Sequence, residues 1–118
     1  MSSRRAERVA ALIQAEVSRL LREEVKDHTI GDISVTEVTV NASLTLAKIR
    51  YVPLGGRGDA VAIHAALEIA AKLMRGPVGR ALRIRTSPEL RFERDMNVEY
   101  AAHMDALFSK LPRPAESE

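Results

Sequence analysis

The sequence predicts a single α+β domain in which helices cover one face of a three-stranded mixed sheet, with one further helix at the C-terminus. A chain of 118 residues with 46% hydrophobic content can build one core but not two. Four segments carry apolar residues at helical spacing, and they surround three segments with strand patterns. The absence of cysteine excludes disulfides, thiolate catalysis and cysteine-based zinc sites.

The first helix is expected to begin after Ser3, its N-cap, and to run to about Lys26. Its apolar residues fall within roughly 120° of a helical wheel. They are Ala6, Val9, Ala10, Ile13, Val17, Leu20 and Leu21. Basic residues occupy an arc of about 60° on the opposite side. This basic stripe consists of Arg4, Arg8, Arg19, Arg22 and Lys26, with Arg5 just beyond it.

Two strands joined by a short turn are expected to form an antiparallel hairpin. Residues 33–40 are rich in β-branched side chains, and their apolar phase shifts between Val35 and Val38, which predicts a bulge. Asn-Ala-Ser at residues 41–43 supplies turn chemistry. The second strand is expected over residues 44–52, where apolar and basic side chains alternate.

A glycine-rich connection over residues 53–58 leads to a helix that Asp59 is expected to cap. Gly76-Pro77 is expected to break or kink this helix, because proline lacks an N–H donor and restricts the residue before it. A short further helix is then expected to about Leu82.

The last strand is placed within residues 83–94, which combine strand patterning with concentrated arginine. Leu82, Ile84, Leu90 and Phe92 alternate with arginines, so one face can be buried while the other presents guanidinium groups. Ser87-Pro88 marks a bulge or the entry to the strand.

A final helix is expected, with Asn97 as its cap. Its predicted apolar face consists of Val98, Ala101, Ala102, Met104, Leu107 and Phe108. The domain is expected to cover residues 1–111, and residues 112–118 are expected to be a disordered tail.

Several segments together resemble one known family. They are Arg5-Ala-Glu-Arg8-Val9 with Ile13 and Leu20-Leu21, then Ile30-Gly-Asp-Ile-Ser-Val-Thr-Glu-Val38, Ala47-Lys-Ile-Arg-Tyr-Val52, and Leu82-Arg-Ile-Arg85 followed by Pro88-Glu-Leu-Arg-Phe92 and Asp95. The order helix, strand, strand, helix, helix, strand is that of a type II KH domain. Over about residues 4–111 the chain resembles the bacterial ribosome-binding factor A family of small-subunit assembly factors.

A cytoplasmic location is expected, because nothing in the sequence resembles a signal peptide. The resemblance implies a non-enzymatic factor without a cofactor. It implies binding to the free small (30S) ribosomal subunit, assistance in late maturation and processing of the 16S rRNA precursor, and a role in growth in the cold. No membrane partner is expected, because no apolar run reaches spanning length. The chain is expected to be a monomer, and release from the subunit leaves a role open for an assembly GTPase.

The helix junction departs from the family pattern. RNA-binding KH domains carry a GxxG loop between paired helices, whereas this family usually has an Ala-x-Gly kink, which here falls on Ala70-Ala71-Lys72. Gly76-Pro77-Val78-Gly79 spells GxxG one turn later. Such a clamp presents backbone donors to phosphates, and proline supplies none. We therefore expect a helix break there rather than an RNA clamp.

Arginine is expected to carry the contact with RNA. The net charge is only +2, yet the segment from Lys72 to Arg94 contains seven basic residues and only two acidic ones. Aromatic residues make up 3% of the chain, and Phe92 and Phe108 lie on apolar faces, which argues against base stacking on an aromatic platform. Besides the basic stripe and Arg5, the candidates are Lys72, Arg75, Arg80, Arg83, Arg85, Arg91 and Arg94, with Arg80, Arg83 and Arg85 favoured.

Other functions remain open. The chain could be a general single-stranded RNA-binding KH module, a protein-only adaptor that uses the last helix, or a metal-dependent nuclease built on Glu89, Glu93 and Asp95. Arg91 between the two glutamates favours an ion-paired ladder over a metal cluster. The three histidines share no metal-ligand spacing, so no metal is expected, and His64 with Glu68 is read as an exposed helical pair. The basic stripe could equally be solvated, with Arg19 paired to Glu16 and Glu23.

Overall fold

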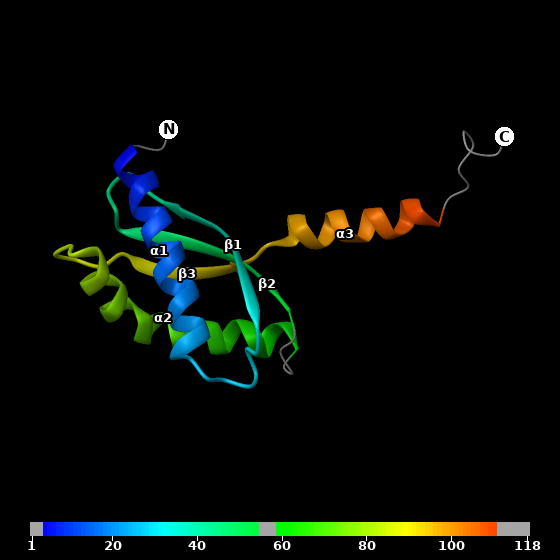
Figure 1. Cartoon of the computed structure of the whole chain (residues 1–118), viewed down its shortest axis with the longest axis horizontal. Coiled ribbons are helices and arrows are strands. Elements are labelled where there is room, and N and C mark those ends of the chain that lie inside the picture. The colour runs from blue at the N-terminus through cyan, green and yellow to red at the C-terminus, as the bar shows by residue number, and fades with distance from the viewer. Residues whose placement is uncertain (1–3, 55–58, 111–118) are drawn as a thin grey trace.

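The structure, a computed structural model, describes residues 4–54 and 59–110, apart from the side chains of residues 98–100 and 102. Its elements are α1 (Arg4–Glu23), β1 (Ile33–Val40), β2 (Leu46–Pro53), α2 (Ala60–Leu82), β3 (Glu89–Arg94) and α3 (Met96–Ser109). The sheet order is β1-β2-β3, with β1 antiparallel and β3 parallel to the central β2 (Figure 1). The predicted α+β class, the mixed three-stranded sheet and the additional C-terminal helix are confirmed.

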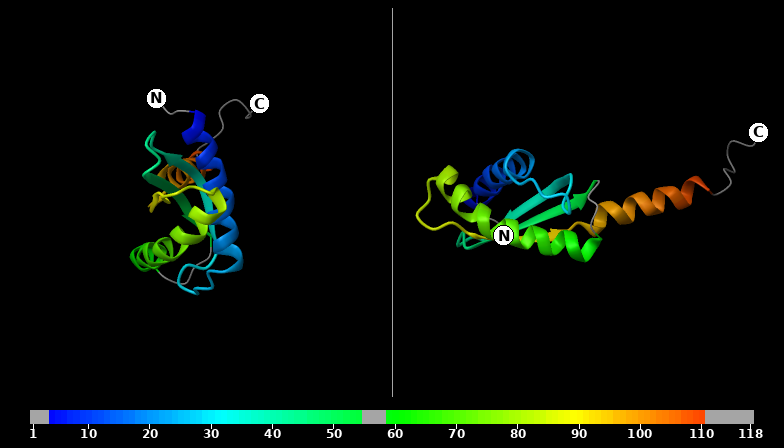
Figure 2. Two further views of the ribbon diagram at one scale, coloured as in Figure 1. Left: turned by 90° about the vertical axis from the view of Figure 1, so that its left-hand side faces the viewer. Right: turned by 90° about the horizontal axis from the view of Figure 1, so that it is seen from below.

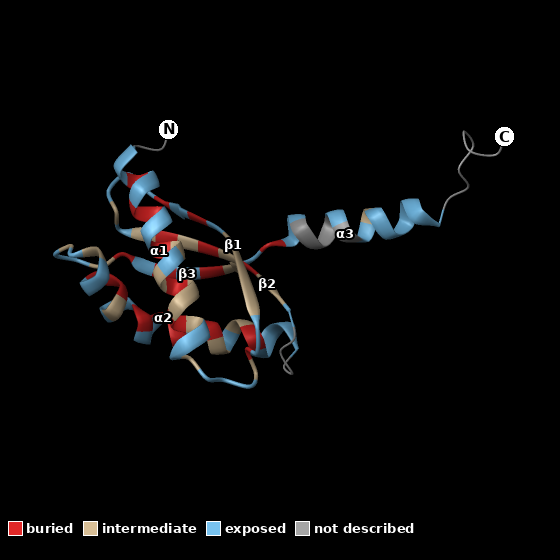
Figure 3. Cartoon of the chain, in the orientation of Figure 1, coloured by how far each residue is buried: buried red, intermediate tan, exposed pale blue. Residues whose placement is uncertain are grey.

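One face of the sheet forms the core with α1 and α2. Val38, Ile49 and Phe92 lie side by side across the three strands and are all buried. The buried residues lie on the strands and on α1 and α2, whereas the described residues of α3 are mostly exposed (Figure 3). On α1 the predicted apolar face is buried from Ala6 to Leu20, whereas Leu21 is half-buried. The helix ends at Glu23 rather than near Lys26. Ser3 lies outside the described residues, so its role as the N-cap stays a prediction.

The second helix, α2, differs from the sequence prediction. Asp59 caps it as expected, because its side chain accepts a hydrogen bond from the Ala62 N–H. The two helices expected on either side of Gly76-Pro77 are instead one continuous helix, which changes direction along its length (Figure 1). Val78, directly after the proline, is fully buried, so packing offsets the cost of about 3 kcal/mol that an internal proline imposes.

The C-terminal helix α3 differs from the sequence prediction in its cap and in its packing. Asp95 supplies the cap instead of Asn97, since Asp95 Oδ1 accepts a hydrogen bond from the Asn97 N–H at 3.0 Å. One residue separates β3 from α3, so the chain cannot turn back, and α3 projects from the body (Figure 2). Leu107 and Phe108 are therefore exposed rather than buried. Val98 and Ala102 of the predicted apolar face lie outside the described side chains.

The bulge predicted in the first strand is present, with a register shift between Val35 and Glu37. It brings the side chain of Thr36 past β2 to the end of β3. There Thr36 Oγ1 donates a hydrogen bond to Asp95 Oδ2 at 2.5 Å, and Asp95 is 8% exposed. The bulge thus ties the edge strand β1 to the junction of β3 and α3.

We expect Thr36→Val to lower the free energy of unfolding by about 1–3 kcal/mol, because a buried carboxylate loses its hydroxyl donor while the side-chain shape is kept. Urea denaturation measures this change. Thr39→Val is the matched control, since Thr39 is exposed on the same strand and its replacement should stay within about 0.5 kcal/mol. Equal stability of the two variants would contradict the proposed role of this bond.

Candidate nucleic-acid interface

Residues 83–88 form a loop held against α2, so the strand placed within residues 83–94 occupies their second half, from Glu89, and Ser87-Pro88 marks its entry as predicted. Arg75 donates from Nε and Nη2 to the Ser87 carbonyl oxygen, at 3.2 and 3.0 Å. Arg83 ends α2 in a left-handed conformation with φ of 56°, so the chain leaves the helix in a turn instead of a strand. Pro88 is fully buried. The loop therefore has a fixed path, which places Arg85.

Gly79 allows this loop to approach the helix. A Cβ atom at residue 79 would lie 2.9 Å from Ser87 Cβ, closer than real contacts permit. Apart from its chain neighbours, a Cβ at Gly76 would meet only Arg80 Nη1, at 3.4 Å. Both glycines of the GxxG sequence lie inside α2. The sequence therefore does not form a loop between two helices, and Gly79 serves as a contact point between α2 and residue 87.

Three arginines from three separate segments surround one hollow of about 490 Å³, which we call the arginine hollow. Arg5 comes from α1, Arg75 from α2 and Arg85 from the loop before β3. The rest of its lining consists of Ala42, Ser43, Leu44, Thr45, Ile84, Thr86 and Ser87. Three guanidinium groups without a carboxylate repel one another, and a phosphate placed between them relieves that repulsion.

The turn between β1 and β2 contributes hydroxyl and backbone groups to this hollow. Asn41 Oδ1 accepts hydrogen bonds from the Thr45 and Leu46 N–H groups, at 2.8 and 3.0 Å. The hydroxyls of Ser43 and Thr45 lie 3.0 Å apart. Leu44 has a left-handed backbone with φ of 59°, a conformation that is uncommon for non-glycine residues and clusters at functional sites. Residues 44 and 45, predicted as the start of the second strand, belong to this turn instead, because β2 begins at Leu46.

The outer face of the sheet is ion-paired and offers no excess of positive charge. Lys48, Arg50 and Arg91 share it with Glu37, Glu89 and Glu93, as the strand register requires. Arg50 Nη1 lies 3.0 Å from Glu37 Oε1, and Arg91 Nη2 lies 3.0 Å from Glu89 Oε2. Of the ladder expected from Glu89, Arg91 and Glu93, the pair of Arg91 with Glu89 is thus present. A polyanion gains little from this face.

Ion pairing also occupies part of the basic stripe on α1. Arg19 Nη2 lies 2.7 Å from Glu16 Oε2, and Arg19 Nη1 lies 3.7 Å from Glu23 Oε1. The hydrogen bond from Arg19 holds the pKa of Glu16 below its usual value, so this carboxylate stays charged. Arg22 also contacts Glu23, at 3.4 Å. Arg4 and Arg8 lie near the start of α1 and are exposed.

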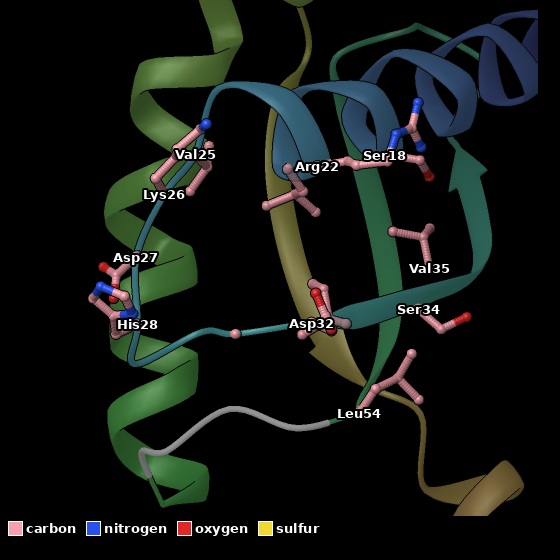
Figure 4. A pocket seen from close by; sticks show the side chains of 13 residues that line it. Ser18, Arg22, Val25, Lys26, Asp27, His28, Asp32, Ser34, Val35 and Leu54 are labelled. Atoms are coloured by element: carbon pink, nitrogen blue, oxygen red, sulfur yellow. The ribbon is translucent and has the colours of Figure 1, made fainter.

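A second hollow, of about 770 Å³, lies between the end of α1, residues 25–32 and the start of β1 (Figure 4). Its lining includes Arg22 and Lys26, which share it with Asp27 and Asp32. The opposite charges balance there. The C-terminal part of the predicted stripe is therefore a poorer phosphate site than its N-terminal part.

Lys72, Arg75 and Arg91 line a groove of about 620 Å³ between α2 and the edge strand β3, which we call the α2–β3 groove. Arg75 thus lines both the groove and the arginine hollow. His64 also lines the groove. Its Nε2 lies 3.1 Å from Glu68 Oε1, as expected, and its Nδ1 lies 3.2 Å from the hydroxyl of Tyr51, a contact that the sequence did not indicate.

The structure therefore divides the predicted RNA-binding residues. It gathers Arg5, Arg75 and Arg85 at one hollow, with Lys72 in the adjoining groove. Arg80 and Arg83 are exposed at the end of α2 and are not among the residues that line the arginine hollow or the α2–β3 groove, and Arg94 is exposed at the end of β3. Of the three arginines favoured from the sequence, only Arg85 is in the hollow.

Two of the three carboxylates considered for a nuclease have other partners. Glu89 pairs with Arg91, and Asp95 accepts from Thr36 and Asn97. Among the described residues, no three acidic, histidine or cysteine side chains gather where they could share a metal ion. Over the same residues, none of the helices combines the length and apolar character needed to cross a bilayer.

Relatives of known name share most of this chain. A protein from Desulfitobacterium hafniense named ribosome-binding factor A is 35% identical over 118 residues, which is all of this chain and 94% of the relative. The Synechocystis protein of the same name is 38% identical over 120 aligned residues, covering 99% of this chain and 90% of the relative.

Solved structures share the fold at low sequence identity. The crystal structure of ribosome-binding factor A from Thermus thermophilus superposes with a TM-score of 0.66 at 15% identity, covering 75% of this chain and 94% of that one. A homology model of the Thermus thermophilus protein, fitted into an electron cryo-microscopy map of its complex with the 30S subunit, has a TM-score of 0.52 at 20% identity, with 70% and 90% coverage. The family model for ribosome-binding factor A matches residues 5–108, and the chain belongs to the ribosome-binding factor A family.

Proposed function

We propose that this chain binds the free small ribosomal subunit through its RNA and assists late maturation and processing of the 16S rRNA precursor without catalysing a reaction. The arginine hollow is the observation that carries the proposal, because it combines three guanidinium groups with hydroxyl groups at one place, and no carboxylate is among the described residues that line it. The 30S complex described for the Thermus thermophilus protein supports the choice of partner.

The physical role follows from how arginine binds RNA. Guanidinium groups bridge phosphate oxygens, and folded RNA is recognised mainly through its backbone and shape. Side chains from α1, α2 and the loop before β3 can grip phosphates from two RNA segments at once. Such a grip would hold a junction in its immature conformation until the subunit is complete. Because this grip must be broken when the subunit is complete, we include release by an assembly GTPase in the proposal. We also propose that the chain acts as a monomer in the cytoplasm.

Sedimentation with purified subunits tests this function. The protein should pellet with free small subunits and remain in the supernatant with large subunits and with intact ribosomes. If about five phosphates are contacted, the logarithm of the association constant should fall with the logarithm of salt concentration at a slope of roughly minus three to minus five. Equal binding to both subunits would contradict the proposal, and equal binding to free single-stranded RNA would favour a general RNA-binding module.

A further inference from the structure

The α2–β3 groove differs chemically from the arginine hollow beside it. Lys72, Arg75 and Arg91 are balanced there by Glu68, Glu89 and Glu93, while Ala71, Leu90 and Phe92 give it apolar surface. A groove without net charge and with an apolar floor suits a nucleobase better than a phosphate. The two sites share Arg75, so an RNA strand could place its phosphates in one and a base in the other.

His64 provides a flat surface in this groove. Its ring is stacked on that of Tyr51, with an angle of 20° between the planes and 6.3 Å between the centroids. The contacts to the Tyr51 hydroxyl and to Glu68 engage both ring nitrogens, so the ring is held in one orientation. The His64 side chain is 41% exposed, which leaves part of the ring open to a ligand. Bases stack on such rings in single-stranded RNA complexes.

Glu93 is the carboxylate of the groove whose oxygen atoms can still accept hydrogen bonds from a ligand. Glu68 is engaged by His64, and Glu89 by Arg91. Over the part of the chain that the structure describes, the Glu93 side chain makes no ion pair or hydrogen bond, although it is half-buried. A half-buried carboxylate without a partner gains free energy when it accepts hydrogen bonds from a ligand.

We propose that the α2–β3 groove binds one unpaired guanine of the RNA, stacked on His64 and read by Glu93. This inference rests on the proposed RNA-binding function. Guanine presents two adjacent donors, N1–H and the N2 amino group, which match the two oxygens of one carboxylate. Cytosine and adenine present one amino group beside a ring nitrogen lone pair, and uracil presents one N–H between two carbonyl groups. Each of these edges is a poorer match.

The path of the RNA follows from the arrangement of α2. His64 and Arg75 are eleven residues apart on this helix, so they are separated by about 16 Å along its axis. Arg75 is bound to the loop before β3, and its end of the groove adjoins the arginine hollow. The strand therefore runs along α2 from the arginine hollow toward His64. Lys72 lies between these two ends and can neutralise a phosphate on the way.

Base selectivity in short oligonucleotides tests the proposal. Fluorescence anisotropy would compare labelled hexauridylate with four variants that carry guanine, adenine, cytosine or hypoxanthine at one central position. We expect the guanine oligomer to bind at least about tenfold more tightly than the uracil, adenine and cytosine oligomers. Hypoxanthine, which lacks the N2 amino group, should lie between guanine and the others. Equal affinity for all five oligomers would overturn the proposal.

The variant Glu93→Gln separates base reading from general attraction. It should reduce the preference for guanine to about twofold or less, while hexauridylate binds as well as before or slightly better, since a negative charge has been removed. Glu37→Gln, which removes a carboxylate from the same sheet outside the groove, should keep the preference. A preference that persists in Glu93→Gln would also overturn the proposal. If base selectivity is absent while the protein still sediments with small subunits, the guanine site fails and the proposed function stands.

Discussion

Charge reversal of Arg5 and Arg85 together is expected to weaken binding to the free small subunit by about 100-fold or more at physiological salt. Both guanidinium groups line the arginine hollow, and neither makes a hydrogen bond or ion pair within the described residues. Each charge-assisted contact with a phosphate contributes about 1.5–3 kcal/mol, and replacement by glutamate adds repulsion. Because both side chains are exposed, the thermal unfolding midpoint should change little.

A control variant with the same change in net charge distinguishes the loss of the arginine hollow from a general electrostatic effect. The double variant Lys48→Glu and Lys110→Glu alters the net charge by the same amount, but these residues lie on the outer sheet face and after α3. Its affinity should fall by less than about fivefold at physiological salt, because charges beyond a Debye length of about 8 Å are screened. Sedimentation across a salt series would also measure how the logarithm of the association constant falls with the logarithm of salt concentration. This slope should be smaller in magnitude by about two for the double variant Arg5→Glu and Arg85→Glu, and unchanged for the control. Equal losses in the two double variants would rule out a localised phosphate site.

The sequence predicted a helix that ends near Leu82 and a strand within residues 83–94, and both are present, but it did not show where β3 begins. The alternation at Arg83, Ile84 and Arg85 was compatible with a strand, yet these residues lie in a loop that starts at the left-handed cap Arg83. Two or three alternating residues are too few to identify a strand. The bulge at Thr36 was predictable, because its cause is a phase shift within one segment. The continuation of α2 past Pro77 was not, since it depends on the burial of Val78.

The candidate site was predicted as a set of arginines but not as an arrangement. Charge counting found Arg5, Arg75 and Arg85 along with ten other basic residues, and it could not tell which of them would meet. Their meeting depends on how α1, α2 and the hairpin turn pack around the loop before β3. Glutamates on neighbouring turns marked Arg19 as a paired residue in advance. The contact of His64 with Tyr51 had no sequence signal, because it depends on how α2 packs against the sheet.

The second large effect is expected from Gly79→Ala, which should lower the free energy of unfolding by about 1–2 kcal/mol. The new Cβ would lie 2.9 Å from Ser87 Cβ, so the loop must move away from α2. Overpacking of this kind costs about 1–3 kcal/mol, of which the higher helix propensity of alanine returns up to about 1 kcal/mol. Movement of residue 87 also weakens the hydrogen bonds from Arg75, so subunit binding should fall together with stability.

Gly76→Ala provides a comparison within the same helix and thereby tests the reason. Apart from its chain neighbours, its Cβ would meet only the end of the flexible Arg80 side chain, at 3.4 Å, and the restriction that Pro77 places on the residue before it offsets the higher helix propensity of alanine. The free energy of unfolding should therefore stay within about 0.5 kcal/mol of the wild-type value, and the variant should bind subunits normally. Ser87→Gly in the Gly79→Ala background removes the atom that collides and should recover part of both losses. If urea denaturation showed the two alanine variants to be equally stable, the close approach of the loop would not be what requires glycine at residue 79. A glycine pair that serves as a phosphate clamp predicts a different pattern, in which both alanine variants lose binding without losing stability.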